Sequence, residues 1–143
     1  MANEKTARAT WEGDLIHGSG HVTSGTGVVD ADMTWAARAE DVEGVSPEEL
    51  IAAAHATCVL MALAAGLARE GNAPTRLESE ARTSFDKVGE GFKLTTIQIT
   101  IRGQVDGLDE DGFRQAAEQA KENCPVSEAL KGNVDISVEA SLG

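Results

Sequence analysis

Aromatic and basic residues are both scarce in this chain of 143 residues. Aromatics make up 3% of it, with no Tyr, two Trp and three Phe, so the sequence lacks the stacking platform on which single-stranded nucleic acids bind. Lys and Arg number 12 against 24 Asp and Glu, which gives a formal net charge of -12. Such a charge repels phosphate backbones and anionic lipid surfaces. We therefore expect neither a nucleic acid nor a membrane as a partner.

The sequence also shows no signal-peptide pattern and has few cysteines. Its first residues, MANEK, place no apolar stretch behind a basic one, so we expect a cytoplasmic protein. The most apolar run, residues 50–68, is long enough to span a membrane, but it contains His55 and is flanked by acids, so a buried helix explains it better. In a reducing compartment, the two cysteines indicate free or redox-active thiols more than a structural disulfide.

What is present is the composition of a folded domain. Hydrophobic residues make up 41% and charged residues 25% of the chain, which excludes intrinsic disorder and low-complexity classes. At this length a hydrophobic core needs no metal or disulfide to stabilise it. We predict a single domain over residues 1–143.

A strong helix-start signal lies in the middle of the chain. Ser46 is placed as N-cap, Pro47 at the first helical position, and Glu49 three residues after the cap to close a capping box. The residues that follow are apolar on nearly every side as far as about Arg69, which predicts a helix enclosed by other elements.

Strand and helix patterns surround this central helix. Alternating or β-branched residues punctuated by glycines predict short strands before it, and a hairpin with a β-bulge near Thr95 after it. We predict strands at residues 6–11, 21–26, 36–42, 77–88, 92–102 and 134–142, and further helices at 109–123 and 125–130. This order predicts an α+β fold with a mostly antiparallel sheet around a long, buried central helix.

The two cysteines differ in their expected surroundings. Cys124 precedes Pro125 at a helix start, where backbone N–H groups favour a thiolate, although from position alone a small residue filling the cap is the favoured interpretation. Cys58 lies in the middle of the apolar helix, where a free cysteine is commonly an inert packing residue with a raised pKa. His55, three residues earlier, lies near Cys58 on the helix surface; a nucleophile pair is conceivable, but a hydrogen-bonded core histidine is favoured.

Two further sets of residues deserve geometric consideration. Glu49 lies nine residues before Cys58, which on an ideal helix places the two side chains on opposite sides and about 13.5 Å apart along the axis. If both belong to one site, a symmetric dimer in which Glu49 of one subunit faces Cys58 of the other is the shortest solution. Arg38 could pair with Glu49, or it is an ordinary exposed arginine.

His17 and His21 flank a Gly-Ser-Gly turn, but without further ligands at the right spacing they are a weak metal signal, and we expect no metal.

Three segments together resemble a known family. They are residues 11–13 (WEG), 46–58 (SPEELIAAAHATC) and 123–130 (NCPVSEAL). In this order and separation they resemble the OsmC/Ohr family of osmotically inducible protein C and organic hydroperoxide resistance proteins, and its OsmC branch in particular. The resemblance covers essentially the whole chain. It implies an intertwined α+β homodimer with two active sites at the interface.

The resemblance also implies an activity and roles for four residues. It implies a cysteine-dependent peroxidase that reduces organic hydroperoxides, and hydrogen peroxide more weakly, with no cofactor. Cys58 would be the peroxidatic cysteine and Cys124 the resolving cysteine, while Arg38 and Glu49 of the partner subunit would hold the reactive thiolate. A disulfide between Cys58 and Cys124 would then be reduced by an external dithiol such as a lipoylated protein.

Two other functions use the same residues differently. In a redox-sensing or ligand-binding stress protein, the cysteine pair switches conformation and turnover is incidental. In a structural dimer module, both thiols are inert and survive peroxide unmodified. The peroxidase is the hypothesis that the combined motifs favour.

Overall fold

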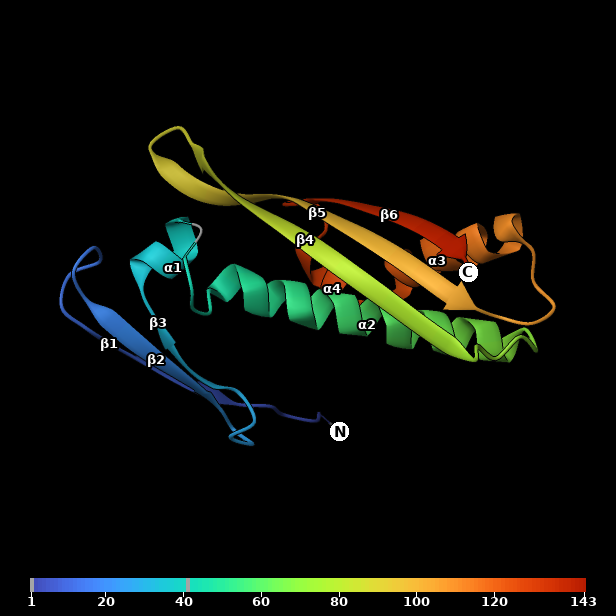
Figure 1. Cartoon of the computed structure of the whole chain (residues 1–143), viewed down its shortest axis with the longest axis horizontal. Coiled ribbons are helices and arrows are strands. Elements are labelled where there is room, and N and C mark those ends of the chain that lie inside the picture. Colours follow the sequence, from blue (N-terminus) through green and yellow to red (C-terminus); the bar gives the residue numbers. More distant parts are fainter. Residues whose placement is uncertain (1, 41) are drawn as a thin grey trace. The chain divides into compact units, whose positions relative to one another are not determined.

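The structure is a computed structural model that describes residues 2–40 and 42–143. The chain divides into two units, residues 1–50 and 51–143, each with its own three-stranded sheet (Figure 1). The elements in chain order are β1 (Ala7–Glu12), β2 (Ser19–Ser24), β3 (Asp30–Met33), α1 (Trp35–Ala39), α2 (Pro47–Arg69), β4 (Arg76–Val88), β5 (Gly91–Gln104), α3 (Glu110–Asn123), α4 (Pro125–Leu130) and β6 (Asp135–Leu142). The α+β class is confirmed.

The first unit is an antiparallel sheet followed by a short helix. Its strands lie in the order β1-β2-β3. All six residues of β1 are exposed, so neither face of this strand is covered by the rest of its unit. A sheet that covers no apolar face contributes little hydrophobic stabilisation by itself.

One predicted strand in the first unit is wrong. Residues 36–42 were expected to be extended, but Trp35–Ala39 form α1. The hydroxyl of Thr34 accepts a hydrogen bond from the Ala37 N–H at 3.1 Å, which caps the helix, and the alanines that follow favour helix over strand. The strand that does precede α1 is β3, which the sequence analysis missed, and Asp41 lies outside the described residues.

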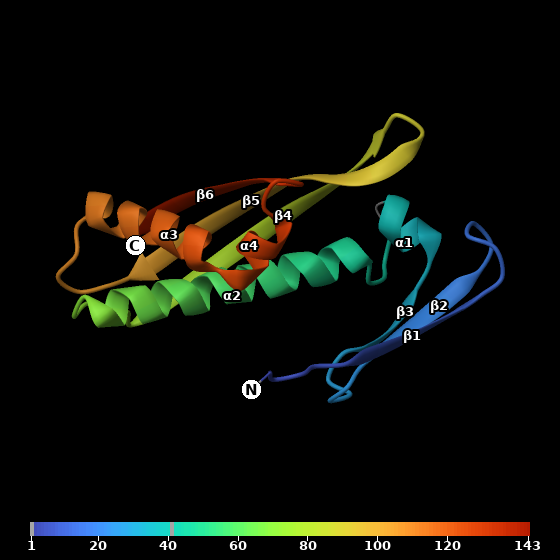
Figure 2. The same cartoon turned by 180° about the vertical axis from the view of Figure 1, so that it is seen from behind.

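The second unit is a sheet covered by helices on one side. β4 and β5 form an antiparallel hairpin, and β6 pairs with β5 in parallel. Thr83 pairs with Ile97 and Phe85 with Leu94, so one residue of β4 faces two of β5, and the predicted β-bulge near Thr95 is confirmed. The helices α2, α3 and α4 lie on the same side of this sheet (Figures 1 and 2).

The core of the second unit lies between that sheet and its helices. Its fully buried members come from one edge of α2, alternate positions of β5, and the inner face of α3. They are Val59, Leu63, Leu67, Ile97, Ile99, Ile101, Phe113, Ala117 and Ala120, with Cys124 beside them. The alternation along β5 and the 3.6-residue spacing along the helices place these side chains on facing surfaces.

Helix α2 is buried on one side only. Val59, Leu63 and Leu67 are within 2% of full burial, whereas Met61 is 69% exposed. By length and composition alone, α2 is the one helix in the described part of the chain that could cross a membrane, a test that core helices also pass. The sequence predicts apolar residues on nearly every side of this helix. A single chain covers only part of that apolar surface.

Candidate active site

The structure brings Cys58 and Cys124 together in the second unit. Cys58 lies in the middle of α2 and is half-buried; Cys124 is fully buried at the N-cap of α4, with Pro125 at the first helical position. Both are free thiols, and each shifts the pKa of the other. Cys58 and Cys124 are therefore neighbours in the second unit.

The surroundings separate the two thiols in acidity. Burial raises the pKa of Cys58, and so does the hydrogen bond in which its thiol donates to Cys124, while the Val126 N–H acts in the opposite direction. Burial alone would also raise the pKa of Cys124, but the Ser127 N–H, the Cys58 thiol, the Ser127 hydroxyl and the Val126 N–H together lower it. Cys124 thus lies at the predicted N-cap with a lowered pKa, although its side chain makes no cap hydrogen bond.

An ion pair lies in the first unit, where Arg38 of α1 binds Glu48 of α2. The Arg38 Nε lies 3.0 and 3.2 Å from the two carboxylate oxygens of Glu48, and a terminal guanidinium nitrogen lies 2.8 Å from Oε1. Glu48 is 7% exposed. A bidentate contact to a buried carboxylate fixes the direction of the guanidinium, which leaves its remaining N–H groups oriented by the pair.

This pairing corrects the expectation for Glu49. The carboxylate bound to Arg38 belongs to Glu48, not to Glu49, which is exposed. The backbone N–H of Glu49 donates to the Ser46 hydroxyl at 3.1 Å, as the capping box predicts. Because successive helix positions differ by about 100°, the side chains of Glu48 and Glu49 face different directions, and the one that faces Arg38 is Glu48.

His55 is neither free nor part of a simple pair with Cys58. It is fully buried, and its Nε2 lies 2.6 Å from the hydroxyl of Ser127, which is also buried. Burial lowers the pKa of His55. The favoured interpretation, a hydrogen-bonded core histidine, is correct, but its partner lies in α4 beside Cys124 and not in its own helix.

The other two histidines are bound to carboxylates at the surface. His17 lies 3.0 Å from Asp14, and His21 lies between Asp32, at 2.7 Å from Nδ1, and Asp30. The hydrogen bonds to Asp32 and Asp30 raise the pKa of His21. Within residues 2–40 and 42–143, no group of three or more His, Cys, Asp or Glu side chains is placed to hold a metal ion.

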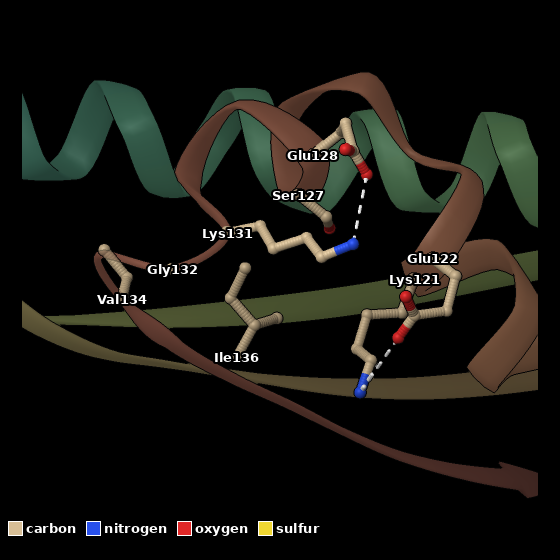
Figure 3. Close-up of a pocket in the computed structure, with 8 residues that line it drawn as sticks. All are labelled: Lys121, Glu122, Ser127, Glu128, Lys131, Gly132, Val134 and Ile136. Atoms are coloured by element: carbon tan, nitrogen blue, oxygen red, sulfur yellow. Dashed lines mark ion pairs between the residues drawn. The ribbon is translucent and has the colours of Figure 1, made fainter.

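A cavity of about 150 Å³ lies against α4 on the side of β6 (Figure 3). Its wall includes Ser127, Val134 and Ile136, and Lys131 pairs with Glu128 across it at 3.8 Å. Neither cysteine lines this cavity.

Sequence reasoning missed two residues of this arrangement. Glu48 was available once the capping box had assigned Glu49 to the helix start, so the signal was present. Ser127 gave no signal of its own, because a serine in a short helix is ordinary, and only the fold brings it to His55, 72 residues earlier. The cysteine pair and the Arg38–Glu48 pair belong to different units.

Comparison with known proteins identifies the family to which these motifs belong. The model of the family described as OsmC-like protein matches residues 39–139. The chain is 38% identical over 140 residues to peroxiredoxin OsmC of Escherichia coli (strain K12), covering 97% of this chain and 98% of that protein. It is 36% identical over 137 residues to organic hydroperoxide resistance protein OhrB of Bacillus subtilis (strain 168), covering 94% and 96%.

Solved structures agree with these sequence matches. The crystal structure of OhrB of Bacillus subtilis matches with a TM-score of 0.76 and 31% identity, over 95% of this chain and 98% of that one. The crystal structure of an organic hydroperoxide resistance protein OsmC from Legionella pneumophila matches with a TM-score of 0.77 and 25% identity, over 95% and 96%. On the family model, the relatives and the fold, this chain belongs to the OsmC/Ohr family.

Proposed function

We propose that this protein is a thiol peroxidase that reduces organic hydroperoxides to alcohols in stress defence. The observation that carries the proposal is the pairing of two free cysteines, each of which shifts the pKa of the other, with the pKa of Cys124 lowered. The names of the relatives, peroxiredoxin OsmC and organic hydroperoxide resistance protein OhrB, support the same substrate class.

The first chemical step belongs to Cys58. Cys58 is the less buried of the pair, so a peroxide meets it first. Its thiolate attacks the outer oxygen of the hydroperoxide, the O–O bond breaks, and the alcohol leaves with a proton. Cys58 is then a sulfenic acid, and the peroxide has been reduced by two electrons.

The second step belongs to Cys124. Its thiolate attacks the Cys58 sulfur, the S–O bond breaks, and hydroxide leaves and takes up a proton as water. The product is a Cys58–Cys124 disulfide. An external dithiol, for which a lipoylated protein is our candidate, returns both cysteines to thiols while it becomes a disulfide itself.

The Arg38–Glu48 pair supplies the positive charge that the first step needs. A guanidinium beside Cys58 lowers the thiol pKa against the effect of burial and holds a peroxide oxygen, while Glu48 fixes its direction. Glu48 lies ten residues before Cys58, which is about 15 Å of rise along α2 and about 80° of net rotation, so its carboxylate lies too far along the helix to reach Cys58 of its own chain. We therefore assign Arg38 and Glu48 to the partner subunit's contribution to each site.

A homodimer agrees with the surfaces that one chain leaves uncovered. Met61 on α2 is 69% exposed, and Val28 and Leu15 in the first unit are 86% and 52% exposed. Exposed apolar residues in the loops of the first sheet and on a long helix are typical of surfaces that another chain covers. Two copies related by a two-fold axis would cover them and complete two sites.

Intact mass under non-reducing conditions tests the chemistry. One equivalent of cumene hydroperoxide is expected to remove about 2 Da from the wild type, with the link mapping to Cys58 and Cys124. In Cys124→Ser, Cys58 is expected to gain about 16 Da as a sulfenic acid that dimedone traps. Modification of Cys124 first, or of neither thiol, would sink this mechanism.

Turnover separates the peroxidase from the sensor. With excess dithiol, a peroxidase consumes many equivalents of hydroperoxide per subunit, whereas a sensor stops after one. Cumene hydroperoxide is expected to be consumed faster than hydrogen peroxide. Oxidation that stops at one equivalent with the dithiol still reduced would favour the redox-sensing alternative.

A further inference from the structure

Two polar side chains in the core have no part in the proposed mechanism. His55 on α2 is fully buried and Ser127 on α4 is 5% exposed, and the His55 Nε2 lies 2.6 Å from the Ser127 hydroxyl oxygen. The other ring nitrogen of His55 is buried and has no hydrogen-bond partner among the described residues. A leucine at position 55 would avoid the cost of burying that nitrogen, so stability alone does not account for the histidine.

The hydrogen bond between His55 and Ser127 joins the two helices that carry the cysteines. His55 lies three residues before Cys58 on α2, and Ser127 lies three residues after Cys124, the N-cap of α4. Residues three apart on a helix are neighbours on its surface and differ by about 4.5 Å of rise. The bonded pair is therefore about one helical turn from each cysteine.

Apolar packing alone does not fix the orientation of α4. Val126 and Leu130 pack against the core, but apolar contacts are not directional. On the side of β6, a cavity of about 150 Å³ borders α4, so closely packed side chains do not hold the helix there (Figure 3). A hydrogen bond between two buried side chains has a defined length and angle, and it supplies the directional constraint.

Cys124 joins α3 to α4, so its position depends on both helices. Its backbone N–H donates to the Ala120 carbonyl at 2.9 Å, which ends α3, and Pro125 begins α4 directly after it. On the side of α4, the contact of Ser127 with His55 holds the first turn of the helix against α2. A disulfide needs its two Cα atoms about 4.4–6.8 Å apart, so its formation tolerates little displacement of that turn.

We propose that His55 and Ser127 are positioning residues that hold α4 on α2 in the orientation from which Cys124 closes the disulfide with Cys58. This inference rests on the proposed function and concerns its second step. In that step, the Cys124 thiolate attacks the sulfur of the Cys58 sulfenic acid, the S–S bond forms as the S–O bond breaks, and the hydroxide that leaves takes up a proton from solvent as water. His55 and Ser127 exchange neither protons nor electrons in it.

The rate of disulfide closure also decides the fate of the Cys58 sulfenic acid. It either forms the disulfide with Cys124, or a second hydroperoxide transfers an oxygen to the sulfur, leaves as a second alcohol, and produces the irreversible sulfinic acid. Rapid closure favours the product that a dithiol can reduce. The contact between His55 and Ser127 therefore protects Cys58 from over-oxidation.

Single-turnover kinetics test this proposal. The reduced protein is mixed with one equivalent of cumene hydroperoxide, and peroxide loss and disulfide formation are followed separately by acid quench, alkylation and mass. Ser127→Ala and His55→Leu are expected to slow disulfide formation about tenfold and to change peroxide loss by less than about threefold. His55→Gln, whose side-chain amide can both donate and accept, is expected to restore most of the rate.

The double variant tests whether the two side chains act as one contact. If they do, His55→Leu with Ser127→Ala is expected to close the disulfide no more slowly than the slower single variant, whereas effects that multiply would show that each residue acts separately. With excess hydroperoxide, the single variants are expected to gain about 32 Da as the Cys58 sulfinic acid in a larger fraction of molecules than the wild type.

Ser79→Ala is the matched control. The Ser79 hydroxyl is half-buried and donates to the Ala56 carbonyl of α2 at 2.9 Å, so this variant removes a similar hydroxyl from the surroundings of the same helix. It is expected to leave disulfide formation at the wild-type rate. Equal slowing of both steps in the Ser127 and His55 variants, or an unchanged disulfide rate in both, would overturn the proposal.

A measurement without peroxide keeps the inference separate from the peroxidase itself. At equilibrium with reduced and oxidised dithiothreitol, the oxidised fraction of Cys58 and Cys124 reports the effective concentration of one thiol at the other. This effective concentration is expected to fall about tenfold in Ser127→Ala and His55→Leu and to stay unchanged in Ser79→Ala.

The outcomes of this equilibrium are distinct. An effective concentration that none of the variants changes refutes the inference, even if the disulfide forms. A wild type that forms the disulfide with oxidised dithiothreitol but not with hydroperoxide refutes the proposed function instead. A wild type that forms it by neither route refutes both.

Discussion

Glu48 and Glu49 are adjacent carboxylates with different surroundings. Glu48 is buried and accepts a bidentate hydrogen bond from Arg38, whereas the exposed Glu49 contributes its backbone N–H to the cap of α2. Changing either glutamate to glutamine removes one negative charge from the same helical turn. The pair therefore offers a comparison in which composition is constant and only position differs.

We expect Glu48→Gln to lower kcat/KM for cumene hydroperoxide about tenfold to hundredfold. A hydrogen bond to a charged group is worth about 1.5–3 kcal/mol, and each 1.4 kcal/mol is about tenfold in rate. Glu49→Gln keeps the cap through its backbone and is expected to stay within about twofold of wild type. Steady-state kinetics with a fixed dithiol measure both, and a larger loss in Glu49→Gln would return the role to Glu49.

The role of a residue was predictable where its sequence neighbours determine it. The N-cap position of Cys124 follows from the proline after it, and the structure confirms that position. The carboxylate that binds Arg38 could not be chosen by residue type, since two glutamates are adjacent. Only the direction of each side chain around α2 separates them.

At the scale of elements, β5 and α3 approach closely at Gly103. A Cβ built there would lie 2.5 Å from the ring of Phe113 and 3.0 Å from Leu77. Phe113 is fully buried, so its ring cannot move away into solvent. Glycine at this position of β5 allows the aromatic ring of α3 to lie directly on the sheet.

Gly103→Ala is therefore expected to destabilise the protein by about 1–3 kcal/mol, the usual cost of overpacking a core. Gly91→Ala at the start of the same strand is the control, because nothing lies within 4 Å of a Cβ there. Urea unfolding followed by circular dichroism measures both. Equal midpoints for the two variants would show that α3 can shift away from the sheet at no cost.

The strands β2 and β3 carry a pH-sensitive contact. Asp32 and Asp30 on β3 raise the pKa of His21 on β2 above its ordinary value of 6.5. A pKa raised by folding stabilises the folded state fully below about pH 6.5, and this contribution is lost as the pH rises through the folded-state value. We expect NMR titration of His21 to show a raised pKa that falls in Asp32→Asn. An unchanged His21 pKa in Asp32→Asn would show that Asp32 does not raise it.

Elements with strong local signals were predictable, and short ones were not. The capping box and apolar run gave the start and end of α2, and the alternating hairpin gave β4, β5 and the bulge. The four residues of β3 and five of α1 carry too little periodicity to separate strand from helix. The parallel pairing of β6 with β5 depends on a crossover through α3 and α4, which no local pattern encodes.

At the scale of the whole molecule, the two residue pairs of the proposed mechanism lie in different units. Cys58 and Cys124 lie in one unit and Arg38 and Glu48 in the other. Each pair is formed within its own unit, so the local sequence or the fold of that unit is enough to predict it. How the pairs combine depends on assembly, and for this the uncovered apolar surfaces favour a second copy of the chain.

Mixing two inactive variants tests whether each site is shared between subunits. Arg38→Met keeps both cysteines but loses the guanidinium, and Cys58→Ser keeps Arg38 but loses the nucleophile. In a heterodimer of the two, a shared site receives Cys58 from one subunit and Arg38 from the other, so one of its two sites is intact. If subunits pair at random from an equal mixture, half of the dimers are heterodimers, and we expect about a quarter of the wild-type activity.

The alternative arrangement gives a different number. If Arg38 acts on Cys58 of its own chain, both sites of every heterodimer lack one of the two groups, and mixing recovers no activity above that of the separate variants. Subunit exchange is followed by native mass spectrometry of the mixture, so that a failure to exchange is not mistaken for a site within one chain. A second mixture of Arg38→Met with Glu48→Gln, which lose groups of the same pair, is expected to gain nothing, because no pairing of these two variants restores Arg38 and Glu48 together.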